Sequence, residues 1–218
     1  MQVIAVLNQK GGSGKTTIST HLARALQIGG DSVLLVCSDP QGSARDWAAV
    51  REDQPLPVVG IDRPTIERDL KNISSGRDFV VIDGAPQIAD LAVSAIKAAN
   101  LVLIPVQPSP YDIWAASDLV ELVKQRIEVT DGRLRAAFVI SRLIKGTRLA
   151  AEVREALRGY GLPVLSSRIS QRVNFPGSAA RGLTVMDAEP DGEAAREIFA
   201  LADEVRRLLT HPFEAITN

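Results

Sequence analysis

The chain has 218 residues, 45% of them hydrophobic and 23% charged, and its formal net charge is −1. Such a chain can bury a large core, so we expect a single domain spanning residues 1–218. One cysteine, Cys37, is too few for a disulfide framework or a thiolate metal site, and no apolar run reaches the roughly eighteen residues of a membrane span, so we expect a cytoplasmic protein.

Short β-branched runs alternate with helical segments along the chain. We expect buried strands at residues 2–8, 32–38, 79–83, 101–106, 136–141 and 163–169, and helices at 15–28, 42–51, 65–73, 88–98, 112–127 and 148–160. This alternation is typical of βα units, which form a mostly parallel sheet with ligands at the carboxyl ends of its strands. A last helix at 192–209 should close the core with Ile198, Ala202, Val205 and Leu209.

The segment NQKGGSGKTT, residues 8–17, lies between the first strand and the first helix, which is the context of a phosphate-binding loop. It matches G-x-x-x-x-G-K-[ST] from Gly14 onward but has Gln9 where the motif begins with glycine. The glycines allow successive backbone N–H groups to face phosphate oxygens, beside the positive end of the helix. Lys15 would then neutralise the phosphates, and Thr16 would offer its hydroxyl to Mg²⁺.

Two strands end in a carboxylate at the same predicted edge. The run FVVID ends in Asp83, as in a Walker B strand whose acid orients the magnesium shell. Asp39 follows the strand SVLLVCS. It could stabilise a turn or cap a helix, or it could lie near the γ-phosphate and position the attacking water.

Four segments, KGGSGKTT, DPQGSARDW, FVVIDGAP and LVLIPVQPSPYD, together resemble the ParA/MinD family of deviant Walker A ATPases, and most closely its short plasmid-partition members. The resemblance covers about residues 1–115 with specific motifs. It implies the α/β fold of a P-loop NTPase, a mostly parallel, helix-flanked sheet of about seven or eight strands. It also implies hydrolysis of ATP with Mg²⁺.

The resemblance assigns a role to the second lysine of the loop, Lys10. In such proteins this lysine reaches across an ATP-sandwich homodimer to the partner's phosphates, and without the dimer we expect it to be an unpaired, solvated side chain. The implied catalytic residues are Lys10, Lys15 and Asp39, and the implied metal residues are Thr16, Asp39 and Asp83. The nucleotide would contact Lys10, Gly11, Gly12, Ser13, Gly14, Lys15, Thr16 and Thr17.

The resemblance extends to two segments farther along the chain. Residues 105–116 correspond to a proline-rich segment near the dimer face, where Trp114 either contacts the partner or packs in the core. After the strand at 136–141, where relatives often carry Asn-Arg, this chain has Ser141-Arg142. Arg142 is therefore one candidate for the adenine pocket, and the loop RISQRVNFPG at residues 168–177 is another.

Three classes of function share this scaffold. The favoured one is a partition ATPase, which is cytoplasmic, associates with the nucleoid in its ATP state, and is stimulated by a centromere-binding, ParB-like adaptor protein. A Min-type regulator would need a basic amphipathic C-terminal helix, whereas residues 193–209 carry a net charge of −1, so we expect no stable membrane association. An iron–sulfur enzyme would need two cysteine ligands per subunit. A ligase of the same superfamily is disfavoured by Lys10 and the proline-rich segment.

Basic residues concentrate between residues 126 and 181, where eleven Lys and Arg face four Asp and Glu, a net charge of +7. Such a region can bind non-specific DNA through phosphate contacts, or its arginines can be solvated or paired within the chain. The candidate DNA contacts are Lys145, Arg148, Arg168, Arg172 and Arg181.

Overall fold

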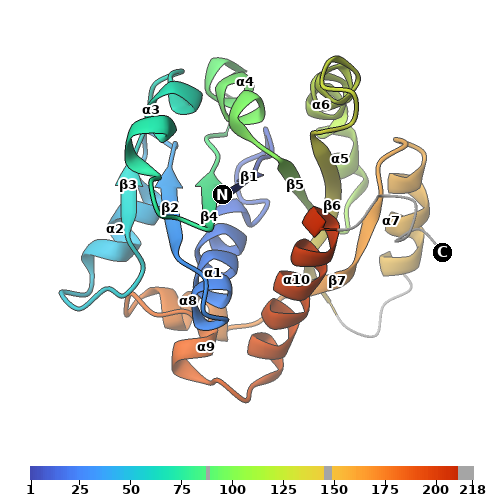
Figure 1. Cartoon of the computed structure of the whole chain (residues 1–218). Helices are drawn as coiled ribbons and strands as arrows, with labels where there is room; N and C mark the ends of the chain where they lie inside the picture. The colour runs from blue at the N-terminus through green and yellow to red at the C-terminus, as the bar shows by residue number, and fades with distance from the viewer. Residues whose placement is uncertain (87–88, 145–148, 211–218) are drawn as a thin grey trace.

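The computed structural model describes residues 1–86, 89–144 and 149–210, with no description of the side chains of 149–151 (Figure 1). Its centre is a seven-stranded sheet of order β3-β2-β4-β1-β5-β6-β7, in which every neighbouring pair is parallel. The strands are β1 (Gln2–Val6), β2 (Val33–Cys37), β3 (Val58–Gly60), β4 (Phe79–Asp83), β5 (Leu101–Val106), β6 (Arg135–Leu143) and β7 (Val164–Ser170).

Helices cover both faces of the sheet, so the central strands are buried on both sides and consist of apolar runs rather than alternating residues. In β1, Ile4 and Val6 face one apolar cluster, whereas Val3 and Ala5 face the other. Figure 1 shows α1 and α10 on one side of the sheet and α3, α4 and α6 on the other. The first cluster packs on α1 (Lys15–Ile28), α2 (Ser43–Ala49), α8 (Asn174–Ala179), α9 (Val185–Ala188) and α10 (Glu193–Thr210). The second cluster packs on α3 (Ile66–Ile73), α4 (Ala89–Ala98), α5 (Pro110–Trp114), α6 (Ser117–Val129) and α7 (Leu149–Arg158).

The strand register brings three loops together at one edge. Asp83, at the end of β4, pairs with Val6 at the end of β1 and with Cys37 at the end of β2. The loops that follow these strands therefore begin at the same level, at the carboxyl edge of the sheet. The loop after β1 is the glycine-rich segment, and the loop after β2 contains Asp39.

The sequence predicted six of the seven strands, and it placed α1 and the core-closing α10 correctly to within one residue at each end. It missed β3, which has three residues between proline and charged segments, and it missed the short α8 and α9. The helix expected at 112–127 is two helices, α5 and α6. Pro110 starts α5 early, and the Ala116 N–H bonds to the carbonyl of Ile113 rather than continuing the α-helical pattern.

His21 ties α1 to the start of α9. Its side chain is buried, with Nδ1 at 2.7 Å from the carbonyl of Thr17 and Nε2 at 3.1 Å from the backbone N–H of Val185. Nε2 therefore accepts a hydrogen bond, which requires neutral imidazole with its proton on Nδ1. Burial is the largest cause that lowers the pKa of His21, which falls to about 4.

This histidine should make stability depend on pH. Between about pH 4 and about pH 6.5, His21 is protonated in the unfolded chain but neutral in the folded protein. The free energy of unfolding therefore falls as the pH is lowered through this window. From pH 7 to pH 5 we expect His21 to cost about 2 kcal/mol. Asp83, whose pKa burial raises to about 6, acts in the opposite sense, so the wild type alone does not isolate His21.

The measurement is denaturant unfolding of wild type and His21→Gln at both pH values. The variant should be less stable at pH 7 but should lose about 2 kcal/mol less on acidification. An identical acid loss in both proteins would contradict the assignment.

Candidate functional site

The glycine-rich loop bends through two residues in left-handed backbone conformation. Gly12 has a φ of +76° and Gly14 a φ of +93°, values that residues other than glycine rarely adopt. A Cβ atom added to Gly11 or Gly12 would meet nothing within 4 Å, so the outer face of the loop is open. This open backbone cradle at the start of α1 has the form required to hold a phosphate chain.

The side chains of Asn8, Gln107 and Ser141, which lie just after β1, just after β5 and in β6, hold this loop in place. Asn8 accepts the Lys10 N–H at 2.9 Å and donates to the carbonyl of Pro105 on β5 at 2.6 Å. Gln107 donates to the carbonyl of Gly12 at 2.8 Å, and Ser141 on β6 donates to that of Ser13 at 2.7 Å. The cradle is therefore pre-shaped by contacts that are remote in sequence.

Lys15 lies at the base of the cradle and is almost fully buried. Its Nζ donates to the carbonyl of Lys10 at 3.0 Å, the one hydrogen bond that this ammonium makes to the described residues. Burial lowers the pKa of Lys15, while the nearby carboxylates of Asp83 and Asp39 raise it. A buried ammonium with two unused donors is suited to phosphate oxygens.

Asp83 is fully buried and accepts two hydroxyl hydrogen bonds, from Thr16 at 2.9 Å and Ser19 at 3.1 Å. Burial raises the pKa of Asp83 to about 6, against the opposing effect of both hydroxyls and of Lys15. No group of three or more His, Cys, Asp or Glu able to hold a metal occurs among the residues described. A hydroxyl–carboxylate pair without a full protein cage suits Mg²⁺, which keeps several waters and binds phosphate oxygens.

Asp39 fulfils the turn role considered from the sequence, because its Oδ1 accepts the Gln41 N–H at 2.9 Å. It is also close enough to the centre of the site to raise the pKa values of both Lys15 and Asp83. The structure therefore places a buried negative charge beside the cradle. The role of Asp39 in positioning water stays a prediction.

The environment of Lys10 differs from the prediction. Its Nζ lies 2.6 Å from Oδ2 of Asp112, so the prediction of an unpaired lysine was wrong. The Lys10 side chain is 38% exposed, whereas that of Asp112 is 4% exposed. Asp112 lies in the first turn of α5, and sequence reasoning missed it because 102 residues separate the partners.

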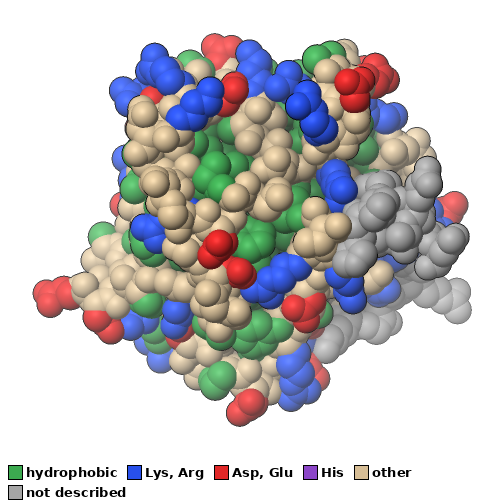
Figure 2. All heavy atoms as spheres, in the orientation of Figure 1, with side chains coloured by type: hydrophobic (Ala, Val, Ile, Leu, Met, Phe, Trp, Pro, Cys, Tyr) green, Lys and Arg blue, Asp and Glu red, His purple; other side chains and the backbone are tan. Residues whose placement is uncertain are grey.

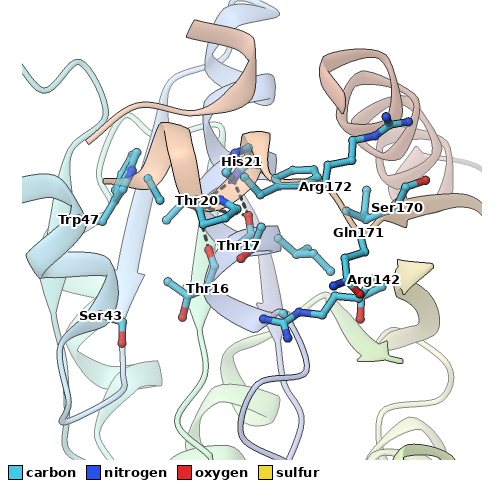
Figure 3. Close-up of a pocket in the computed structure, with 17 residues that line it drawn as sticks. Thr16, Thr17, Thr20, His21, Ser43, Trp47, Arg142, Ser170, Gln171 and Arg172 are labelled. Atoms are coloured by element: carbon cyan, nitrogen blue, oxygen red, sulfur yellow. Dashed lines mark hydrogen bonds between the residues drawn. The ribbon is translucent and has the colours of Figure 1, made fainter. Parts of the chain in front are cut away.

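A cavity of about 470 Å³ opens beside Thr16 and Thr17 at the start of α1 (Figure 3). Figure 3 shows Trp47 on one side and Arg142 with Gln171 on the other. Its volume lies within the range of small-ligand pockets, and its position continues from the phosphate cradle. The geometry therefore suits the base and sugar of a nucleotide.

The lining residues were only partly predicted. Arg142 lies on the rim with a φ of +51°, an uncommon conformation for a residue with a side chain, and the end of β7 and the loop after it contribute Ser170 and Gln171. Phe175 lies within the predicted loop of residues 168–177, whereas Trp47 was missed, because it is apolar and 7% exposed, which in a sequence indicates an ordinary core residue.

The candidate DNA contacts do not form one surface in the described part of the chain. Arg168 pairs in register with Ile140, on the α7 face of the sheet, whereas exposed Arg181 follows α8 on the other face. Arg172 pairs with Glu193 at 2.6 Å and Glu197 at 3.0 Å, so its charge is neutralised within the chain. Figure 2 shows Lys and Arg spread around the rim of the visible face, among acidic side chains. Lys145 and Arg148 lie outside the described residues.

None of the helices in the described ranges combines the length and apolar character that crossing a bilayer requires.

Comparison with known proteins gives a consistent result. Residues 4–185 match the model of the "CobQ/CobB/MinD/ParA nucleotide binding domain". The chain is 32% identical over 211 residues to the maintenance of carboxysome distribution protein A of Halothiobacillus neapolitanus, covering 94% of each. It is 30% identical over 234 residues to the chromosome-partitioning ATPase Soj of Thermus thermophilus, covering 93% of this chain and 94% of Soj. The septum site-determining protein MinD of Pyrococcus horikoshii, solved with Mg-ADP, has the same fold, with a TM-score of 0.78, 18% identity, and coverage of 96% of this chain and 97% of MinD.

Proposed function

Because the chain belongs to the CobQ/CobB/MinD/ParA nucleotide-binding domain family, we propose that it is a partition ATPase that hydrolyses ATP to ADP and phosphate. The observation that carries the proposal is the open glycine cradle in which Lys15 is buried beside Asp83 and Asp39. The Mg-ADP bound in the P. horikoshii protein supports the same ligands here.

The chain's own residues have separable roles in this proposal. The cradle of Gly11, Gly12, Ser13 and Gly14 would hold the phosphates by backbone N–H groups, and Lys15 would compensate their charge. Thr16 and Asp83 would hold Mg²⁺, which when bound neutralises charge on the phosphate oxygens. Asp39 would orient the attacking water. The cavity between Trp47 and Arg142 would hold the nucleoside.

Lys10 extends the proposal to assembly. Its side chain is partly exposed beside the cradle, and in the proposed assembly it would contact a triphosphate held by a second subunit. We therefore propose an ATP-sandwich homodimer, in which Lys10 supplies charge that a single subunit does not.

We propose that the protein segregates DNA. The ATP-bound dimer would bind DNA phosphates without sequence preference, remain cytoplasmic and nucleoid-associated, and release DNA when a centromere-binding, ParB-like adaptor stimulates hydrolysis. The named function of Soj supports this proposal. A second candidate, positioning of a protein cargo, is favoured by the 32% identity with a carboxysome distribution protein.

Binding to unrelated DNA duplexes tests the proposal. With a slowly hydrolysed ATP analogue we expect sequence-independent binding, which should weaken about 1000-fold between 50 mM and 200 mM salt if about six phosphates are contacted per dimer. With ADP we expect no measurable binding.

Anionic vesicles provide the matched control for general attraction to polyanions. DNA binding that is equal with ADP and with the analogue would contradict the partition cycle. Analogue-dependent binding to vesicles but not to DNA would favour a Min-type regulator.

A further inference from the structure

One carboxylate on α10 holds the turn that follows β7. Oε2 of Glu197 accepts the backbone N–H of Ser170 at 2.9 Å, and Oε1 accepts the Ser170 hydroxyl at 2.7 Å. Oε1 also accepts a charge-assisted hydrogen bond from Arg172 at 3.0 Å. Glu197 therefore holds the residues on both sides of Gln171.

The turn held in this way lines the cavity that we assign to the nucleoside. Ser170, Gln171 and Arg172 all contribute to its lining, whereas Glu197 does not. The backbone N–H of Gln171 donates to the carbonyl of Leu143 on β6 at 2.9 Å, which fixes the turn from the neighbouring strand as well. Glu197 can therefore influence a ligand in this cavity through the turn that it holds.

Gln171 is the residue of the turn whose side chain is left for a ligand. The hydroxyl of Ser170 and the guanidinium of Arg172 both bond to Glu197, but the Gln171 carboxamide is exposed and makes no hydrogen bond to the residues that the structure describes. Figure 3 shows Gln171 beside Arg142, whereas the guanidinium of Arg172 is directed toward α10. A carboxamide presents a donor and an acceptor, which match the amino group and a ring nitrogen of adenine.

We propose that Gln171 hydrogen-bonds the base of the bound nucleotide, and that Glu197 is a positioning residue that keeps Gln171 in place through Ser170 and Arg172. The inference rests on the proposed ATPase function and names the residues by which the site would recognise the nucleoside of ATP. It predicts that the contribution of the nucleoside to affinity can be lost separately from that of the phosphates.

The phosphate cradle is held by other contacts. Asn8, Gln107 and Ser141 support it from β1, β5 and β6 or the residues just after them. Glu197 instead contacts the end of β7, the edge strand of the sheet, and the turn that follows. Loss of the Glu197 contacts should therefore weaken binding of a nucleoside and leave binding of the phosphate chain intact.

The same helix provides a matched control. Glu204 lies seven residues after Glu197, about two helical turns, and its carboxylate accepts the backbone N–H groups of Ser166 and Ser167 at 2.8 Å each. Both glutamates thus hold the backbone of β7. Ser166 and Ser167 do not line the cavity, so Glu204 shares the structural role of Glu197 without the positioning role.

Glu197→Gln removes part of these contacts and conserves the shape of the side chain. Both oxygens of Glu197 accept hydrogen bonds, whereas glutamine has one oxygen and an amino group that cannot accept. At least one contact to the turn is therefore lost. Glu204→Gln has the same effect on the two contacts of Glu204.

Titration calorimetry with Mg²⁺ and either ADP or inorganic pyrophosphate tests the inference without hydrolysis of the ligand. Glu197→Gln and Gln171→Ala should each weaken ADP about 5-fold to 10-fold, the effect of losing one hydrogen bond, and should leave the affinity for pyrophosphate unchanged. Glu204→Gln should lower the free energy of unfolding but change neither affinity. Gln171 is exposed, so we expect Gln171→Ala to fold like the wild type.

Two further measurements locate the contact. Wild type should bind ADP about 5-fold to 10-fold more tightly than purine riboside diphosphate, which lacks the amino group of adenine, whereas both single variants should bind the two ligands equally. If Glu197 acts through Gln171, the double variant should bind ADP no more weakly than Gln171→Ala alone. Independent effects would instead multiply and would overturn the positioning role.

Other results would also overturn the inference. They are an equal weakening of ADP and pyrophosphate in Glu197→Gln, the same loss of ADP affinity in Glu204→Gln, and an unchanged ADP affinity in Gln171→Ala. Each of these leaves nucleotide binding by the wild type intact. A wild type that binds neither ADP nor pyrophosphate would overturn the proposed ATPase function itself.

Discussion

Lys15→Ala is expected to lower the affinity for Mg-ATP by at least about 100-fold. Lys15 is buried at the base of the cradle, where a charged contact to phosphate is poorly screened by water. Removing one partner of a buried, hydrogen-bonded charge pair costs about 2–5 kcal/mol, and a 100-fold loss, about 2.7 kcal/mol, lies within this range. Titration calorimetry or a fluorescent ATP analogue measures it directly.

Lys71→Ala is the control for the loss of a positive charge, because Lys71 is exposed on α3. Its affinity for Mg-ATP should equal that of the wild type. Unfolding curves of both variants show whether the substitution has disturbed the fold. An affinity of folded Lys15→Ala within a few-fold of the wild type would show that Lys15 does not contact the phosphates.

The centre of the site could be predicted from sequence because its residues are local or fixed by register. The cradle and Lys15 lie in one continuous segment between a strand and a helix. Asp83 ends one buried strand and Asp39 follows another, and parallel pairing brings the ends of those strands to the same edge as the cradle. The phosphate-loop motif, the pattern of buried strands and one topological rule were therefore sufficient.

The contacts that complete the site could not be predicted in this way. Asp112 is distant from Lys10 in sequence, and its position depends on where α5 begins. Trp47 lines the cavity because α2 packs beside α1, which the apolar pattern alone does not specify. The short β3 and α8 depend on tertiary packing more than on local propensity.

Charge composition also proved a poor guide to surface charge. The net +7 of residues 126–181 includes Arg172, whose two carboxylate partners lie on α10, outside that segment. It also includes arginines on opposite faces of the sheet. Net charge in a segment thus indicates a polyanion surface only when the fold gathers that segment on one side.

Asp39→Ala is expected to retain Mg-ATP binding but to reduce the steady-state rate of hydrolysis by about 100-fold or more, the loss typical when a residue that positions or deprotonates water is removed. The alanine variant also removes a structural contact, because Oδ1 of Asp39 accepts the Gln41 N–H and so stabilises its own turn. Loss of turnover in the alanine variant alone would therefore have two explanations.

The variant Asp39→Asn distinguishes loss of the charge from loss of the turn. An asparagine side-chain oxygen can still accept the Gln41 N–H, so the turn is retained while the negative charge beside Lys15 and Asp83 is lost. If the charge of Asp39 positions the attacking water, both variants should bind Mg-ATP and both should be inactive. Phosphate release and nucleotide affinity, measured on the same samples, decide the question. Near-normal turnover in Asp39→Asn would assign Asp39 to the turn and leave the water-positioning group to be found elsewhere.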